Sequence, residues 1–120
     1  FHEKAEEALA NLPERRKELA RDLVERAKEQ MRSDEYDKCR SLAQRAVQLD
    51  PENDIGTDYL ESLRQQGRND YRVALNLMDK EPEEALSRLQ RSLQLLPTDD
   101  DYYMRARDAK KQVEQKLGQD

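Results

Sequence analysis

Apolar residues recur at steps of three or four along almost the whole chain, and this spacing constrains the fold more than any other feature. Such spacing places them on one face of an α-helix, and that face must then pack against a neighbouring element. It predicts six helices, over residues 2–11, 14–32, 35–49, 54–79, 82–96 and 99–117. No segment alternates between apolar and polar residues as a half-buried strand would. We therefore expect an all-α fold.

The composition favours the same fold class. Val, Ile and Thr total only 7 residues, too few for a β-sheet protein, whose strands need β-branched side chains. Leu, Ile, Val and Phe total only 22 residues, which borders on the composition of disordered chains. The sustained helical spacing argues against disorder, because stacked helix pairs need only narrow apolar stripes.

Proline and glycine mark the helix boundaries. Pro13, Pro51 and Pro97 each follow a helical run, and Pro82 opens one. The connections are short, so successive helices are expected to pack antiparallel. Thr98 is the expected N-cap of the last helix.

Gly67 falls inside the long stretch at 54–79. A mid-helix glycine costs about 1 kcal/mol relative to alanine, so it could divide the stretch into two helices. Apolar positions on both sides of it keep one helical phase, however. We expect a single long helix in which the glycine allows close packing.

Small residues recur at fixed distances from the prolines. Residues 8–13, 46–51 and 92–97 each have a small residue five positions before the proline and an aliphatic residue four before it. Within residues 20–53, large, small and aromatic positions alternate in a longer pattern formed by Leu23, Ala27, Tyr36, Cys39, Ala46, Leu49 and Pro51. This pattern resembles the tetratricopeptide repeat (TPR), a helix-turn-helix of about 34 residues. Residues 82–97 resemble its second helix at Ala85, Leu89, Ser92, Leu93 and Pro97.

The resemblance implies a TPR-like superhelical stack of antiparallel helix pairs. It divides a single domain over 1–120 into repeat 1 (13–51), an irregular repeat 2 (52–97) and a closing helix (98–120). Residues 5–13 resemble the end of a preceding repeat, so we expect a fragment of a larger protein. The implied function is a non-catalytic protein–protein interaction scaffold, as in bacterial multiprotein assemblies. The alternative is a homo-oligomerisation module of the larger protein.

In this family the first helix of each pair lines a concave groove. If that holds here, the partner-binding residues are Arg21, Glu25, Lys28, Arg32, Arg64 and Tyr71. Arg and Tyr are common binding hot spots, so an acidic or aromatic peptide would suit the groove. The alternative is a solvated helix face whose charges pair at helical spacing. The Lys and Asn clamp that binds chaperone tails in some repeats is missing, because the corresponding positions hold Val24 and Lys28, then Asp70 and Ala74.

Two adjacent tyrosines form a second candidate. We expect one of the rings of Tyr102 and Tyr103 to lie in the core and the other to be exposed.

No catalytic motif is present, and we expect neither an enzyme nor a cofactor. With one cysteine and one histidine the chain lacks the ligands of a zinc site. Cys39 falls on a small-residue position of the repeat and is interpreted as a packing residue. The acidic residues of 50–61 have the spacing of a calcium loop, but Ile55 occupies the position that needs glycine. We interpret them as a turn followed by an acidic helix start.

Charge and hydropathy exclude two further classes of partner. The net charge is −5 and no basic stripe is visible, which argues against nucleic acid. No apolar segment is long enough to insert in a membrane. The sequence does not distinguish a cytoplasmic from a periplasmic location, and we expect any targeting segment to lie outside this fragment.

Overall fold

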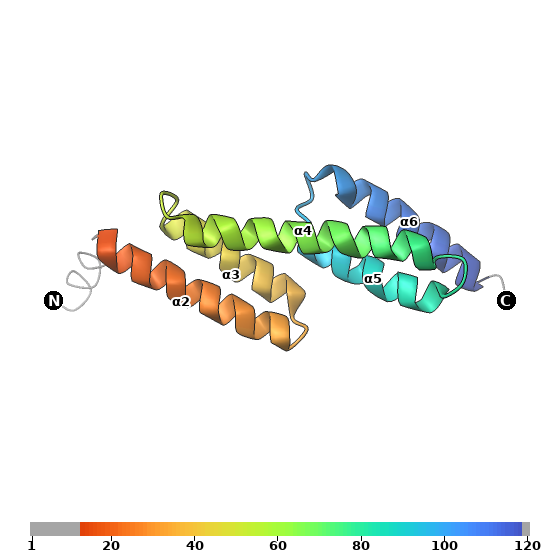
Figure 1. Cartoon of the computed structure of the whole chain (residues 1–120), viewed down its shortest axis with the longest axis horizontal. Coiled ribbons are helices and arrows are strands. Elements are labelled where there is room, and N and C mark those ends of the chain that lie inside the picture. Colours follow the sequence, from red (N-terminus) through yellow and green to blue (C-terminus); the bar gives the residue numbers. More distant parts are fainter. Residues whose placement is uncertain (1–12, 119–120) are drawn as a thin grey trace. The chain divides into compact units, whose positions relative to one another are not determined.

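A computed structural model describes residues 13–118 as helices joined by short turns (Figure 1). Its helices are α2 (Pro13–Arg32), α3 (Tyr36–Leu49), α4 (Asp54–Leu77), α5 (Pro82–Leu95) and α6 (Asp101–Gly118). These described residues contain five helices and no strand, so the predicted all-α class is confirmed. The helix expected at 2–11 lies outside the described residues, and the predicted count of six stays untested.

The helix boundaries follow the sequence signals closely. Pro13 and Pro82 are the first residues of α2 and α5. The cap of α6 differs from the prediction, because Asp100 accepts a hydrogen bond from the Tyr102 N–H at 2.8 Å while Thr98 is exposed. A carboxylate at this position also interacts favourably with the helix dipole.

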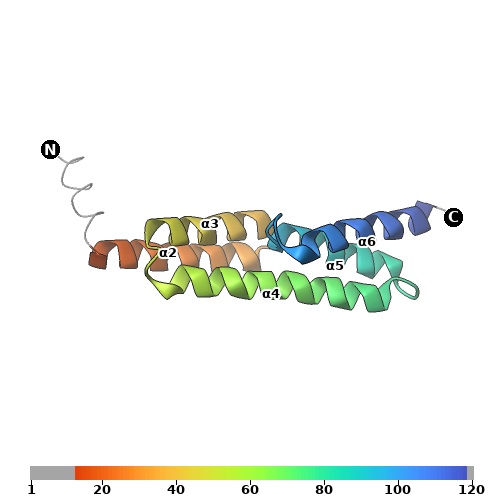
Figure 2. The same cartoon turned by 90° about the horizontal axis from the view of Figure 1, so that it is seen from above.

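The chain forms two compact units, Phe1–Glu61 and Ser62–Asp120. In the first unit α2 packs against α3, and the two helices lie side by side in both views (Figures 1 and 2). Their seam consists largely of small side chains. The buried residues are Ala20, Leu23, Val24, Ala27, Cys39, Leu42, Ala43 and Ala46.

The first turn of α4 approaches α3 closely at Gly56. A Cβ atom there would lie 3.0 Å from the backbone nitrogen of Val47. Residues 50–61 form a tight turn followed by the first turns of α4, which starts at Asp54. The helix start thus falls in the middle of the stretch that has the spacing of a calcium loop.

In the second unit α4 and α5 run antiparallel. Gly67 contacts Leu96 beyond the end of α5, while Asp70, one turn later on α4, pairs with Arg88 and Arg91 in the middle of α5. Helix α4 is continuous through Gly67, as predicted, and ends two residues before the predicted limit. The hydroxyl of Ser92 donates to the Gly67 carbonyl at 2.7 Å, which links α5 to α4 beside this glycine.

Helix α6 completes the second unit and runs parallel to this part of α4. Arg68 contacts Asp100 at the start of α6, and Asp79, just after α4, pairs with Lys116 near its end. The core between the three helices again contains small residues. It consists of Ala74, Ala85, Leu89, Ala106, Ala109 and Val113.

Candidate functional site

The predicted stripe on α2 lies on the surface of the first unit. Arg21, Glu25 and Arg32 are exposed and Lys28 is half-buried. Lys28 Nζ lies 3.2 Å from a Glu25 carboxylate oxygen and 6.0 Å from the centroid of the Tyr59 ring. An ion pair at this helical spacing contributes only a few tenths of a kcal/mol, so the stripe is mainly solvated.

Cys39 sits in the core of the first unit, with its sulfur 3.4 Å from the Tyr59 hydroxyl. Burial raises the pKa of the Cys39 thiol, and the hydrogen bond with Tyr59 lowers it by less. Burial and the same hydrogen bond raise the pKa of Tyr59 as well. The sulfur is therefore a neutral packing atom at neutral pH, and the arrangement does not activate it as a nucleophile.

The other two predicted residues, Arg64 and Tyr71, belong to the second unit. Arg64 Nη1 lies 3.6 Å from Asp100 Oδ2. The Tyr71 ring packs edge-on against Tyr102, with 5.6 Å between the centroids. The six predicted residues thus divide into a set of four on α2 and a set of two on α4, in different compact units.

Arginines gather around Tyr102 in the second unit. The guanidinium carbons of Arg68, Arg72 and Arg105 lie 4.8, 5.3 and 5.3 Å from the centroid of its ring. Arg72 also donates a hydrogen bond to the Tyr102 hydroxyl at 3.1 Å. We call Tyr102 with these three arginines the arginine–tyrosine cluster. Its aromatic face attracts the cations and holds them in place.

A buried carboxylate anchors one side of the cluster. The Asp100 side chain is 1% exposed and accepts two hydrogen bonds from Arg68, at 3.0 and 3.2 Å. Burial raises the pKa of Asp100, but the Tyr102 N–H and the Arg68 and Arg64 guanidinium groups outweigh that effect and hold the pKa below its usual value. Arg68 is thereby neutralised within the protein.

Arg72 and Arg105 differ from Arg68 in this respect. Within residues 13–118 neither has a carboxylate oxygen within 4.0 Å, and both are exposed. The hydrogen bond from Arg72 lowers the pKa of Tyr102, and the charges of Arg72, Arg68 and Arg105 lower it further. The site therefore presents the guanidinium groups of Arg72 and Arg105 to the solvent.

Tyr102 was a candidate from the sequence, but none of the three arginines was. Its expectation for the tyrosine pair was wrong, since both Tyr102 and Tyr103 are half-buried. A signal was present in the spacing of Arg64, Arg68 and Arg72, which places them on one face of α4.

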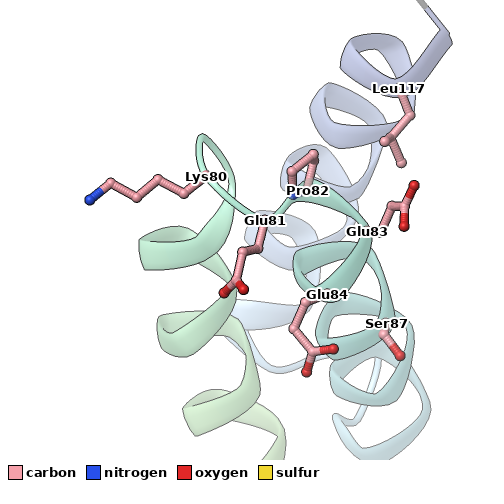
Figure 3. A pocket seen from close by; sticks show the side chains of 7 residues that line it. All are labelled: Lys80, Glu81, Pro82, Glu83, Glu84, Ser87 and Leu117. Carbon is pink, nitrogen blue, oxygen red and sulfur yellow. The ribbon is translucent and has the colours of Figure 1, made fainter.

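The second unit also has an acidic pocket of about 630 Å³ at the turn between α4 and α5 (Figure 3). It is lined by Lys80, Glu81, Pro82, Glu83, Glu84, Ser87 and Leu117. Glu83 and Glu84 lie in the first turn of α5, where the helix dipole favours acidic side chains, and Glu84 pairs with Arg88 at 3.5 Å. These roles in the helix account for the acidic residues.

No group of three or more His, Cys, Asp or Glu side chains within residues 13–118 is placed to hold a metal ion. None of the helices in this part of the chain is both long and apolar enough to cross a membrane.

The chemistry of the second unit is thus that of a surface with exposed cations and aromatic rings, held by buried contacts. A scan against protein-family models and searches of curated proteins and of solved structures found no match to this chain.

Proposed function

We propose that the chain is a non-catalytic helical domain that binds a partner protein or peptide through exposed faces of its helices. The arginine–tyrosine cluster is the observation that carries this proposal. Arg and Tyr dominate binding energies at protein interfaces because they combine large contact areas with directed hydrogen bonds. Here Asp100, the Tyr102 ring and Tyr71 already hold these side chains, so less entropy is lost when a partner binds.

We also propose a TPR-like arrangement of helix pairs, within a multiprotein assembly that the family resemblance suggests is bacterial. Two observations support it. The residues that matched the small positions of the repeat, including Ala27, Cys39 and Ala46, are fully buried. In the second unit α6 runs parallel to α4, as first helices of successive pairs do in a stack.

Partner capture from a native lysate, followed by mass spectrometry, tests this function. The α2 stripe is reversed in one variant (Arg21→Glu, Lys28→Glu and Arg32→Glu), and the cluster is altered in another (Arg72→Gln and Arg105→Gln). A third variant, Arg107→Gln with Lys111→Gln, removes two exposed charges elsewhere on α6. Circular dichroism verifies that each variant is folded.

A binding domain should capture a defined set of proteins, and one of the first two variants should lose it while the third retains it. The same proteins captured equally by all variants and by urea-denatured chain would contradict the proposal. Loss only in the first variant would place the partner on α2, as the repeat resemblance implies.

Homo-oligomerisation is the second candidate, favoured by exposed apolar side chains. Leu75 on α4 and Met104 on α6 are 45% and 48% exposed and are the large hydrophobic residues that the described surface leaves uncovered. Light scattering coupled to size-exclusion chromatography tests it. A self-associating chain should become monomeric on the changes Leu75→Ser and Met104→Ser. A monomeric parent chain would exclude the candidate.

A further inference from the structure

Two guanidinium groups of like charge are held near one ring, and no carboxylate of residues 13–118 pairs with either. Arg72 and Arg105 each lie 5.3 Å from the Tyr102 centroid, one from α4 and one from α6. Gathering two cations costs free energy, which the aromatic face offsets only in part. An anion placed between them would relieve this repulsion.

The nearby carboxylates do not fill this role. Asp100 is occupied by Arg68 and Arg64 on the other side of the cluster. Asp99 and Asp101 line a small pocket with the same two arginines and not with Arg72 or Arg105. Although the chain has a net charge of −5, none of the ion pairs within residues 13–118 involves Arg72 or Arg105, and both cations are exposed.

An exposed apolar side chain lies one turn beyond Arg72 on α4. Leu75 follows Tyr71 and Arg72 by one turn of α4, on the same face of the helix, and is 45% exposed. A ligand that covers both features needs carboxylates for the two guanidinium groups and an apolar residue for Leu75. Nucleic acid fits poorly, because its phosphates call for a row of unneutralised cations. Arg64 and Arg68, which precede Arg72 on α4, are already paired with Asp100.

We infer that Arg72 and Arg105 bind the carboxylates of an acidic segment of the partner protein, with an apolar residue of that segment packed on Leu75. This inference rests on the proposed function and specifies the chemistry of the partner. Guanidinium groups bind carboxylates in a bidentate, charge-assisted manner, which gives both strength and direction. Tyr102 acts as the positioning residue that keeps the two groups in place.

Fluorescence anisotropy tests the inference directly. The probe is a short fluorescein-labelled peptide with consecutive Asp and Glu residues next to one Leu. A second probe has the same sequence with Asn and Gln, and a third adds phosphoserine to the second. The full chain is titrated into each probe at low and at high salt.

The acidic probe should bind, and its affinity should fall at high salt because the exposed charges are screened. Replacing Arg72 and Arg105 by Gln should weaken binding about tenfold or more, since each loses a charge-assisted contact. The control variant Arg107→Gln with Lys111→Gln removes the same charge from exposed positions of α6 and should change the affinity less than about twofold. Tyr102→Leu should weaken binding although both arginines are retained.

Three results would overturn the inference. They are no binding of the acidic probe, equal weakening by the control variant, and binding of the phosphoserine probe alone. A partner captured from lysate that the Arg72 and Arg105 variant still binds would also overturn it, while the proposed function would stand. If a folded chain binds neither the acidic probe nor any protein from the lysate, the inference and the proposed function both fail.

Discussion

The close approach at Gly67 allows a quantitative test of the packing in the second unit. In a free helix, Gly67→Ala would stabilise by about 1 kcal/mol through helix propensity. Here the new Cβ would lie 2.8 Å from Leu96 Cγ and 3.3 Å from Leu95 Cβ, and both leucines are buried. The clashing Cγ atom lies in the middle of the side chain, so it cannot swing away without moving the core.

The cost therefore exceeds the gain. Overpacking a filled core costs about 1–3 kcal/mol. Separating the helices would also lengthen the 2.7 Å hydrogen bond from Ser92 to the Gly67 carbonyl, which contributes about 1 kcal/mol. We expect a net destabilisation of about 1–2 kcal/mol, which lowers the urea midpoint by about 0.5–1 M for a typical slope.

Urea unfolding followed by circular dichroism measures this change. Gly118→Ala is the matched control, because a Cβ there meets no atom within 4 Å and should cost nothing. Combining Gly67→Ala with Leu96→Ala should show a favourable coupling of about 1 kcal/mol, since truncation removes the clashing atom. A Gly67→Ala variant as stable as the parent chain, or the absence of coupling, would refute the reasoning.

Three further predictions concern buried polar groups and a thiol. Asp70→Asn should lower the unfolding free energy by about 2 kcal/mol in a thermal melt, because the fully buried carboxylate no longer accepts charge-assisted hydrogen bonds from Arg88 and Arg91; both arginines are about a third exposed, which limits the cost. The fold lowers the pKa of Asp100, so the ionised carboxylate contributes its full stabilisation above the ordinary aspartate pKa of about 3.9. This stabilisation is lost as the pH falls through the lower pKa of the folded state. In urea titrations below about pH 4, the free energy of unfolding should therefore decline less steeply for Asp100→Asn than for the parent chain. Cys39 should react slowly with Ellman's reagent in the folded chain and quickly in urea, because it is buried and burial raises its pKa; fast reaction without denaturant would contradict this packing.

The sequence predicted the helices well because apolar spacing and proline are local signals. Helices α2 to α6 begin and end within a few residues of the expected limits. The continuity of α4 through Gly67 was predictable too, since apolar positions on both sides share one phase. The close packing at this glycine also agrees with the expectation.

The polar contacts could be predicted only in part, because they join residues far apart in the chain. Arg72 and Tyr102 are 30 positions apart, and their contact depends on α6 lying against α4. The burial of Asp70 could be predicted, since this residue shares the helical phase of Leu63 and Ala74 and therefore faces the core. Its arginine partners on α5 were not apparent from spacing alone.

The buried Asp70 also bears on how α4 and α5 find their correct alignment. A slip of one helical turn would move α5 along α4 by about 5.4 Å. Such a slip would move the Asp70 carboxylate away from Arg88 and Arg91 and leave a charge unpaired in the core, at a cost of several kcal/mol. We therefore expect these ion pairs to favour the observed register of α4 and α5, together with the close fit of Leu96 over Gly67.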